Sequence, residues 1–389
     1  MLGQRARGVE YHRDLALCPL CQGALQLTVR QLPPTKRPVV LALDGGGIRG
    51  MVTLGLLRAL EQRLAGAITL PEIPDLTAGT SVEQVPYNNT SAAEACRRFP
   101  DLAQCIFQPG YFLSHIWPWL GCILNLVRDG AYDSGALERT LQQVCQPGRR
   151  VFDVMPPVAA GRRLAIVASR TSDGKPVVFP NYRGVRHRAV DSAYQRIVSH
   201  GASQNPLLRK AVAELAKEQY TVPDELVRAV LATCFFFELD EGPTRVPGQY
   251  VCRGSVLCAR REPRRILERV LVEFPGAELQ TGRGEHLGRS EDDDGCMVCG
   301  YYRKKVRFHV ASLDEEISIM FKGSSGQQPI GGFPATVRQC LHLQQSDAVF
   351  GRSDHQIDQW PPQRMCYCLR GVKRVRFAEP APSRKKRRV

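Results

Sequence analysis

The segment VVLALDGGGIRGMVTLGLLRALEQRL, residues 39–64, constrains the fold of this chain more than any other. It begins with an apolar run that is typical of a central parallel strand. Three glycines, an arginine and a fourth glycine follow, and then Val52, Leu56, Leu60 and Leu64 recur at every fourth position, as on one face of a helix. Strand, glycine turn and helix in this order predict a turn whose amides surround an anion at the amino end of the helix.

Strand-like and helix-like segments alternate from residue 37 to about residue 285, which predicts an α/β fold. RRLAIVASRT and KPVVFPNY, joined by Ser-Asp-Gly, predict a strand-turn-strand unit. PDELVRAVLATCFFFE predicts a helix that runs into an apolar segment, and CARREPRRILER predicts the start of another helix. KKVRFHVAS and EEISIMFKG, near the C-terminus, resemble paired strands.

Composition and turn signals divide the chain into four expected parts. They are a cysteine-bearing lead and proline-rich linker (1–36), the α/β domain (37–285), a small extension with strands (286–370) and a disordered basic tail (371–389). The acidic run SEDDDGC marks the boundary after the α/β domain.

The 14 cysteines, without a secretory signal, favour reduced thiols or metal ligands over a disulfide framework. Cys18 and Cys21 have zinc-knuckle spacing, as do Cys296 and Cys299. A structural zinc takes four ligands, and neither pair has a second pair within the usual distance of about 12–20 residues. Cys18 and Cys21 therefore stand as zinc ligands or, alternatively, as ordinary cysteines.

The net charge of +15 includes five consecutive basic residues, Arg384 to Arg388. Such a run is typical of a nuclear-localisation signal, of a polyanion-binding patch or of a solvated tail. The basic stretches lack interleaved aromatic residues, which disfavours nucleic-acid binding. The longest apolar stretch, residues 116–127, contains Pro118 and is too short to span a bilayer. We expect an intracellular, cytoplasmic protein, with the nucleus as the alternative.

The glycine turn has two chemical interpretations. Gly45, Gly47 and Gly50 satisfy the spacing of a dinucleotide fingerprint. That fingerprint requires an acid at the end of a second strand about 20 residues on, whereas here the predicted helix continues to Leu64. The segment DLTAGTS supplies the other interpretation, since a strand that ends in Gly79-Thr80-Ser81 indicates a nucleophile elbow. The two motifs together predict acyl transfer, with Ser81 as nucleophile and the turn amides stabilising the oxyanion.

LDGGGIRG followed by DLTAGTS resembles the patatin-like phospholipase family. The resemblance implies a three-layer α/β sandwich with a central, mostly parallel sheet. It also implies that the chain hydrolyses phospholipid or lysophospholipid esters without a cofactor. Ser81 is then the nucleophile and Gly79 the first elbow glycine, and the oxyanion hole comprises Gly45, Gly46, Gly47 and Arg49.

Two positions depart from the family pattern. Glu83 stands where the family has its second elbow glycine, and its charge opposes an oxyanion that forms nearby. Cys252 stands where the family has the aspartate of its Ser-Asp dyad, and a neutral thiol cannot accept the serine proton as a carboxylate does. Asp240, in LDEG, is the nearest carboxylate that also precedes a glycine and is the alternative base. A histidine base, His286 or His200, is a further alternative.

Three functions therefore stay open: a serine lipid hydrolase, an inactive patatin fold that binds lipid or a partner, and an anion- or nucleotide-binding domain. The run YFLSHIWPWLGCILNLV fits either a membrane-facing lip, with Trp117 and Trp119 at the interface, or the core. The sequence makes no prediction of the oligomeric state.

Overall fold

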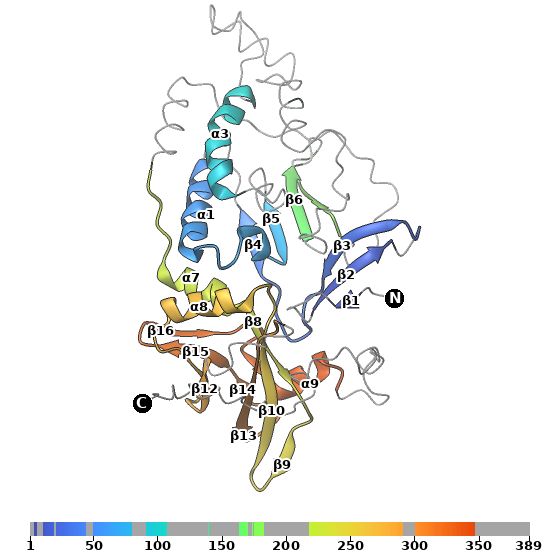
Figure 1. The fold of residues 1–389 in the computed structure, drawn as a ribbon, viewed down its shortest axis with the longest axis vertical. Coiled ribbons are helices and arrows are strands. Elements are labelled where there is room, and N and C mark those ends of the chain that lie inside the picture. The colour runs from blue at the N-terminus through green and yellow to red at the C-terminus, as the bar shows by residue number, and fades with distance from the viewer. Residues whose placement is uncertain are drawn as a thin grey trace, which may run out of the picture.

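The computed structural model shows a mixed α/β protein with several sheets (Figure 1). It describes residues 4–5, 11–18, 21–43, 50–79, 91–106, 139, 163–169, 173, 175–182, 218–290 and 300–346. Five α-helices lie within these residues: α1 (Gly50–Leu64), α3 (Ala92–Ile106), α7 (Asp224–Ala232), α8 (Pro263–Glu273) and α9 (Val337–Leu343). A short 3-10 helix, η2, covers Leu70–Glu72.

The parallel pairs of described strands belong to one four-stranded sheet in the order β4-β5-β6-β7. β4 pairs parallel with β5 and β5 parallel with β6, whereas β7 returns antiparallel beside β6. A central parallel strand was predicted at β4, but among the described strands β4 lies at the edge of its sheet, where Val40 is exposed. The strands of this sheet are β4 (Val40–Leu43), β5 (Leu76–Gly79), β6 (Arg163–Ser169) and β7 (Pro176–Pro180).

The residues expected to form only a lead and a linker contain an antiparallel sheet of their own. Its order is β1-β2-β3, from Gln4–Arg5, His12–Leu17 and Ala24–Arg30. The Cys18–Cys21 segment forms the β2–β3 connection, where Cys18 N donates to Gly23 O over 2.8 Å.

Two antiparallel sheets build the second half of the chain. The first has the order β13-β10-β8, with β9 beside β10, and the second has the order β12-β11-β15-β16. β14 pairs with β17 apart from both sheets. Their bounds are β8 (Phe235–Leu239), β9 (Thr244–Val246), β10 (Gln249–Cys258), β11 (Glu278–Thr281), β12 (His286–Arg289), β13 (Arg303–Val310), β14 (Glu316–Ile317), β15 (Ile319–Gly323), β16 (Gly326–Pro329) and β17 (Ala335–Thr336).

The predicted pairing of the two C-terminal strands is wrong. β13 and β15 are both strands, but β13 pairs with β10, and β15 pairs with β11 and β16. The boundary expected between residues 285 and 286 falls at the turn of the β11–β12 hairpin. Strands from both sides of that position thus share sheets.

One main core joins these sheets to α1. Buried aromatic rings at its centre bring β8 against β15 and β13: the ring centroids of Phe235 and Phe321 lie 5.0 Å apart, and those of Phe237 and Phe308 lie 5.6 Å apart. Leu57 and Leu60 of α1 belong to the same core. Figure 1 shows α1 and α3 with β4–β6 at one end of the molecule and β10 with β13 at the other, with α7 and α8 between them.

Candidate active site

The carboxyl ends of β4 and β5 are neighbours. The two strands pair in parallel register, with Leu43 beside Gly79 at their last residues. The chain leaves Leu43 toward the glycine turn and leaves Gly79 toward Ser81, and α1 begins at Gly50 directly after the turn. Adjacent strands lie about 4.8 Å apart, so both predicted motifs start from one edge of the sheet. We call it the carboxyl edge.

Most of the predicted catalytic residues lie outside the described residues. These are Gly45, Gly46, Gly47, Arg49, Ser81, Glu83 and the alternative base His200. Gly79 is described and ends β5, as the elbow prediction requires of a strand that leads into the serine. The oxyanion-hole and nucleophile assignments therefore stay predictions.

Among the described residues, no acid stands at the end of β5, where a dinucleotide fingerprint would require one. The strand ends in Gly79, and the next carboxylate along the chain after Leu43 and the turn is Glu61, inside α1. Glu61 accepts a hydrogen bond from Ala92 N over 3.0 Å, at the start of α3. Its carboxylate thus joins two helices, which weighs against a nucleotide site at the glycine turn.

Asp240 follows β8 and is held in a polar cluster between strands. Ser255 Oγ donates to both carboxylate oxygens, over 2.8 and 3.0 Å, and Arg303 Nη2 donates to Oδ1 over 2.7 Å. Arg303 Nε also donates to Ser255 Oγ over 3.0 Å. Ser255 is fully buried, so a substrate cannot reach the hydroxyl of this serine–aspartate pair. The cluster joins β8, β10 and β13.

Cys252 is a core residue of β10. Its side chain is fully buried, and it pairs across the strands with Phe308. Burial raises the pKa of the Cys252 thiol to about 12, so the thiol is neutral at pH 7. Cys340 of α9 belongs to the same core, and burial raises the pKa of its thiol to about 11. Cys252 therefore contributes apolar packing rather than a proton acceptor.

The structure does not bring Asp240 or Cys252 to the carboxyl edge. The chain after β10 meets the opposite end of β5, where Arg260 Nη2 lies 3.9 Å from Asp75 Oδ1. Cys252 precedes Cys258 by six positions, about 20 Å along an extended strand. Figure 1 shows β10 running away from β4–β6. His286, the alternative base, is exposed in β12, where its Nδ1 lies 3.1 Å from Glu278.

A carboxylate that sequence reasoning missed lies beyond the carboxyl edge. β6 runs parallel to β5 and continues three residues past Ile166, the partner of Gly79, into the turn that contains Asp173. Asp173 Oδ1 accepts a hydrogen bond from Lys175 N over 3.2 Å, and the side chain is partly exposed. The signal in the sequence was the Ser-Asp-Gly turn, which indicated only a hairpin.

The described ranges contain neither a cluster of metal ligands nor a helix that could span a membrane. Within them, no group of three or more His, Cys, Asp or Glu side chains is placed to hold a metal ion, and the zinc site at Cys18 and Cys21 stays a prediction. In the same part of the chain, no helix has the length and apolar character needed to cross a bilayer.

A comparison with models of known protein families finds no match, and a search of curated proteins finds none either.

Proposed function

We propose that this chain is a patatin-like serine acyl hydrolase that acts on phospholipid or lysophospholipid esters at a membrane surface. The observation that carries the proposal is the register of β4 and β5, which starts the glycine turn and the Ser81 segment from adjacent strand ends. An oxyanion hole must lie about 3 Å from the atom that the nucleophile attacks. Two motifs that leave one edge meet the first condition for that geometry. A three-layer patatin-like sandwich belongs to the same proposal.

The proposed reaction uses Ser81 and the turn amides. Ser81 Oγ attacks the ester carbonyl carbon, and amides of Gly45, Gly46 and Gly47 donate hydrogen bonds to the oxyanion. A base accepts the Ser81 hydroxyl proton and passes it to the alkoxide as the ester C–O bond breaks. Water then gives a proton to the same base and attacks the acyl-enzyme carbonyl, and the fatty acid leaves as Ser81 regains its proton. The base must lie near the carboxyl edge, where Ser81 follows β5. Among the described carboxylates, we assign this role to Asp173, and the labelling experiment tests the assignment.

The second candidate is an inactive fold that binds lipid or a partner. The burial of Cys252 at the position of the family aspartate favours it, because a core thiol with a raised pKa provides no base. The hydrogen bonds that Asp240 accepts from Ser255 and Arg303 also favour the inactive fold, because they give this carboxylate a structural role.

Labelling of the full chain with a fluorophosphonate probe, read by intact mass, tests the first candidate. We expect one adduct in the unmodified chain, none in Ser81→Ala and slower labelling in Asp173→Asn. Asp101→Asn, an exposed aspartate on α3, is the matched control and keeps the unmodified rate. Labelling that persists in Ser81→Ala excludes this serine as nucleophile. A folded chain that takes no label excludes the hydrolase and supports the binding role.

A further inference from the structure

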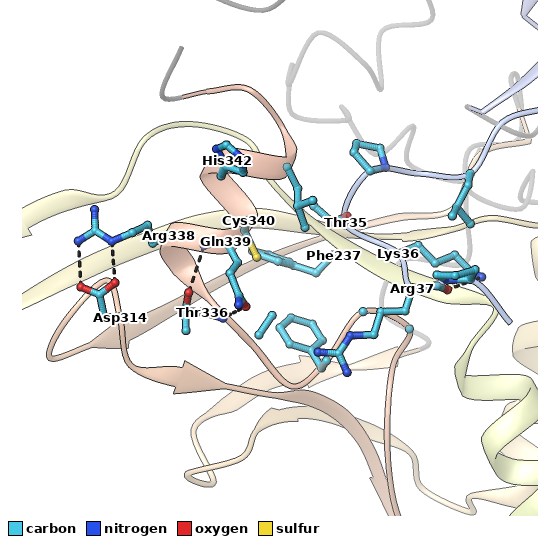
Figure 2. Close-up of a pocket in the computed structure, with 18 residues that line it drawn as sticks. Thr35, Lys36, Arg37, Phe237, Asp314, Thr336, Arg338, Gln339, Cys340 and His342 are labelled. Atoms are coloured by element: carbon cyan, nitrogen blue, oxygen red, sulfur yellow. Dashed lines mark hydrogen bonds and ion pairs between the residues drawn. The ribbon is translucent and has the colours of Figure 1, made fainter. Parts of the chain in front are cut away.

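A pocket of about 890 Å³ lies between the linker and α9 (Figure 2), and its lining does not include Leu43 or Gly79 of the carboxyl edge. Residues 32–38 form one wall, and the segment from Gly331 to Leu343 forms the other. Its volume falls within the range of about 300–1,000 Å³ that is typical of small-molecule sites. Much of the lining is apolar: Leu32, Pro34, Pro38, Phe237, Phe333, Ala335, Cys340 and Leu343.

The wall between linker and loop is tightly packed. A Cβ on Gly332, which has φ +104°, would lie 2.2 Å from Thr35 O, and one on Gly331 would lie 2.9 Å from Phe235 O. Backbone therefore packs directly on backbone at the base of the pocket. A pocket with such a base is largely preformed, which lowers the cost of binding.

Two of the three Lys and Arg side chains of the lining already bind carboxylates. Lys36 Nζ donates to Asp75 Oδ2 over 3.0 Å, and its side chain is fully buried. Arg338 binds Asp314 through two guanidinium nitrogens, with Nε–Oδ1 at 2.6 Å and Nη2–Oδ2 at 2.9 Å. Both side chains are therefore held by carboxylates of the protein, and that of Lys36 is buried as well.

Arg37 is the cation of the lining whose charge no described carboxylate balances. The side chain is exposed, and its Nη2 donates to the carbonyl of Pro334 over 2.6 Å, which holds it across the pocket. Figure 2 shows Arg37 reaching in from the linker and Gln339 from α9. Gln339 Oε1 accepts from Thr336 N, so its amide nitrogen is turned to donate elsewhere.

We propose that this pocket binds a long-chain monocarboxylate, a fatty-acid anion. The carboxylate pairs with the Arg37 guanidinium and accepts from Gln339 Nε2, and the alkyl chain lies against the apolar lining. One exposed cation without a described carboxylate partner matches a single negative charge, and the apolar surface matches a body without polar groups. No residue of the predicted hydrolase site belongs to the described lining, and the proposal does not depend on the hydrolase.

The test is a titration of the full chain, carrying Ser81→Ala to exclude turnover, with the fluorescent probe 11-(dansylamino)undecanoate. We expect saturable binding that palmitate reverses and that hexadecanol, which has the chain without the charge, reverses at least ten-fold less effectively. Hexadecyl phosphate tests whether a second negative charge is tolerated, and we expect it to compete less effectively than palmitate.

Variants locate the site. Arg37→Gln keeps a donor for the Pro334 carbonyl but removes the charge, and we expect about ten-fold weaker binding; Leu343→Glu, at the half-exposed rim, weakens it by repulsion. Arg245→Gln, an exposed arginine on β9, is the matched control and binds as the parent does. Absence of saturable binding, equal competition by hexadecanol and palmitate, or equal affinity of Arg37→Gln and Arg245→Gln overturns the proposal. Failure of the hydrolase proposal is detected separately, by the absence of a fluorophosphonate adduct in the chain that retains Ser81.

Discussion

At the scale of single residues, Asp75 organises the junction between the N-terminal sheet and β5. Lys36 Nζ lies 3.0 Å from its carboxylate and Arg260 Nη2 lies 3.9 Å away, and Arg30 also binds it. Burial alone would raise the pKa of Asp75, but the three cations outweigh burial and hold that pKa below its usual value. Burial, aided by Arg260, lowers the pKa of Lys36 to about 8. Three cations around one carboxylate leave positive charge in a buried place.

Burial, together with nearby positive charge, makes His12 a source of acid sensitivity. Burial, then Arg30, Arg261 and Arg260, lower the pKa of His12 from 6.5 to about 3. Between these two values the unfolded chain binds a proton that the folded chain does not, so stability falls as the pH falls through this window. From pH 6.5 to pH 4 the loss amounts to about 3 kcal/mol. Urea unfolding at several pH values measures it.

His12→Gln removes the titrating group, and its stability should vary with pH by about 3 kcal/mol less than that of the parent over the same window. His286→Gln, which changes an exposed histidine, should keep the parent's dependence. Equal pH dependence in the parent and in His12→Gln would show that His12 is not the responsible group.

At the scale of elements, Gly254 allows β10 to pack between β8 and β13. A Cβ at this position would lie 2.3 Å from Glu238 O and 2.4 Å from the Phe237 ring. Gly254→Ala must therefore move a strand or a core ring, and we expect it to lower the free energy of unfolding by about 1–3 kcal/mol. Chemical denaturation of the full chain measures this change.

Gly242→Ala is the matched control, because an added Cβ there meets nothing within 4 Å. We expect it to change stability by less than about 0.5 kcal/mol. A tolerated Gly254→Ala would contradict the described strand packing. Gly254 follows Cys252 in the segment compared with the family's aspartate-glycine motif, and close packing accounts for this glycine without a catalytic role.

Local pattern predicted the elements well, since a helix or hairpin is encoded by neighbouring residues. The helix of residues 224–232, α8 and the β6–β7 hairpin are confirmed, and the apolar segment after the first of these helices forms β8. The face of α1 was predicted only in part: Leu60 and Leu64 are buried, but Leu56 is 42 % exposed. A repeat of four residues drifts by about 40° per step from the 3.6-residue turn, so it leaves the buried stripe.

Strand partners and site chemistry were harder to predict, because they depend on distant residues. β13 and β15 each have a convincing strand pattern, yet nothing in that pattern names β10 or β11 as a partner. Likewise Cys252 and Asp240 were selected by spacing along the chain, and only the fold shows that one is in the core and the other in a cluster. Asp173 became a candidate only because the parallel register of β5 and β6 places the end of β6 beyond Gly79.

At the scale of the whole molecule, contacts connect parts of the chain that the sequence separated. Tyr11 of the N-terminal sheet donates to Glu238 of β8, and Arg261 Nη2 donates to Thr28 Oγ1 over 3.0 Å. β13 supplies Phe308 and β15 supplies Phe321 to the core that contains β8. The described elements therefore support one another across the boundaries expected after residues 36 and 285.

A chain that ends at residue 285 should consequently fail to fold cooperatively. It lacks β13, so one edge of β10 loses its partner strand, and it lacks the rings of Phe308 and Phe321, so Phe235 and Phe237 lose their packing partners. Loss of a single buried Phe costs about 3–5 kcal/mol, which is comparable with the whole stability of many domains. We expect a broad thermal transition in near-UV circular dichroism and rapid proteolysis. A chain that ends at Ser346 keeps every described contact and should unfold sharply; a cooperative transition in both would show that residues 1–285 form an independent domain.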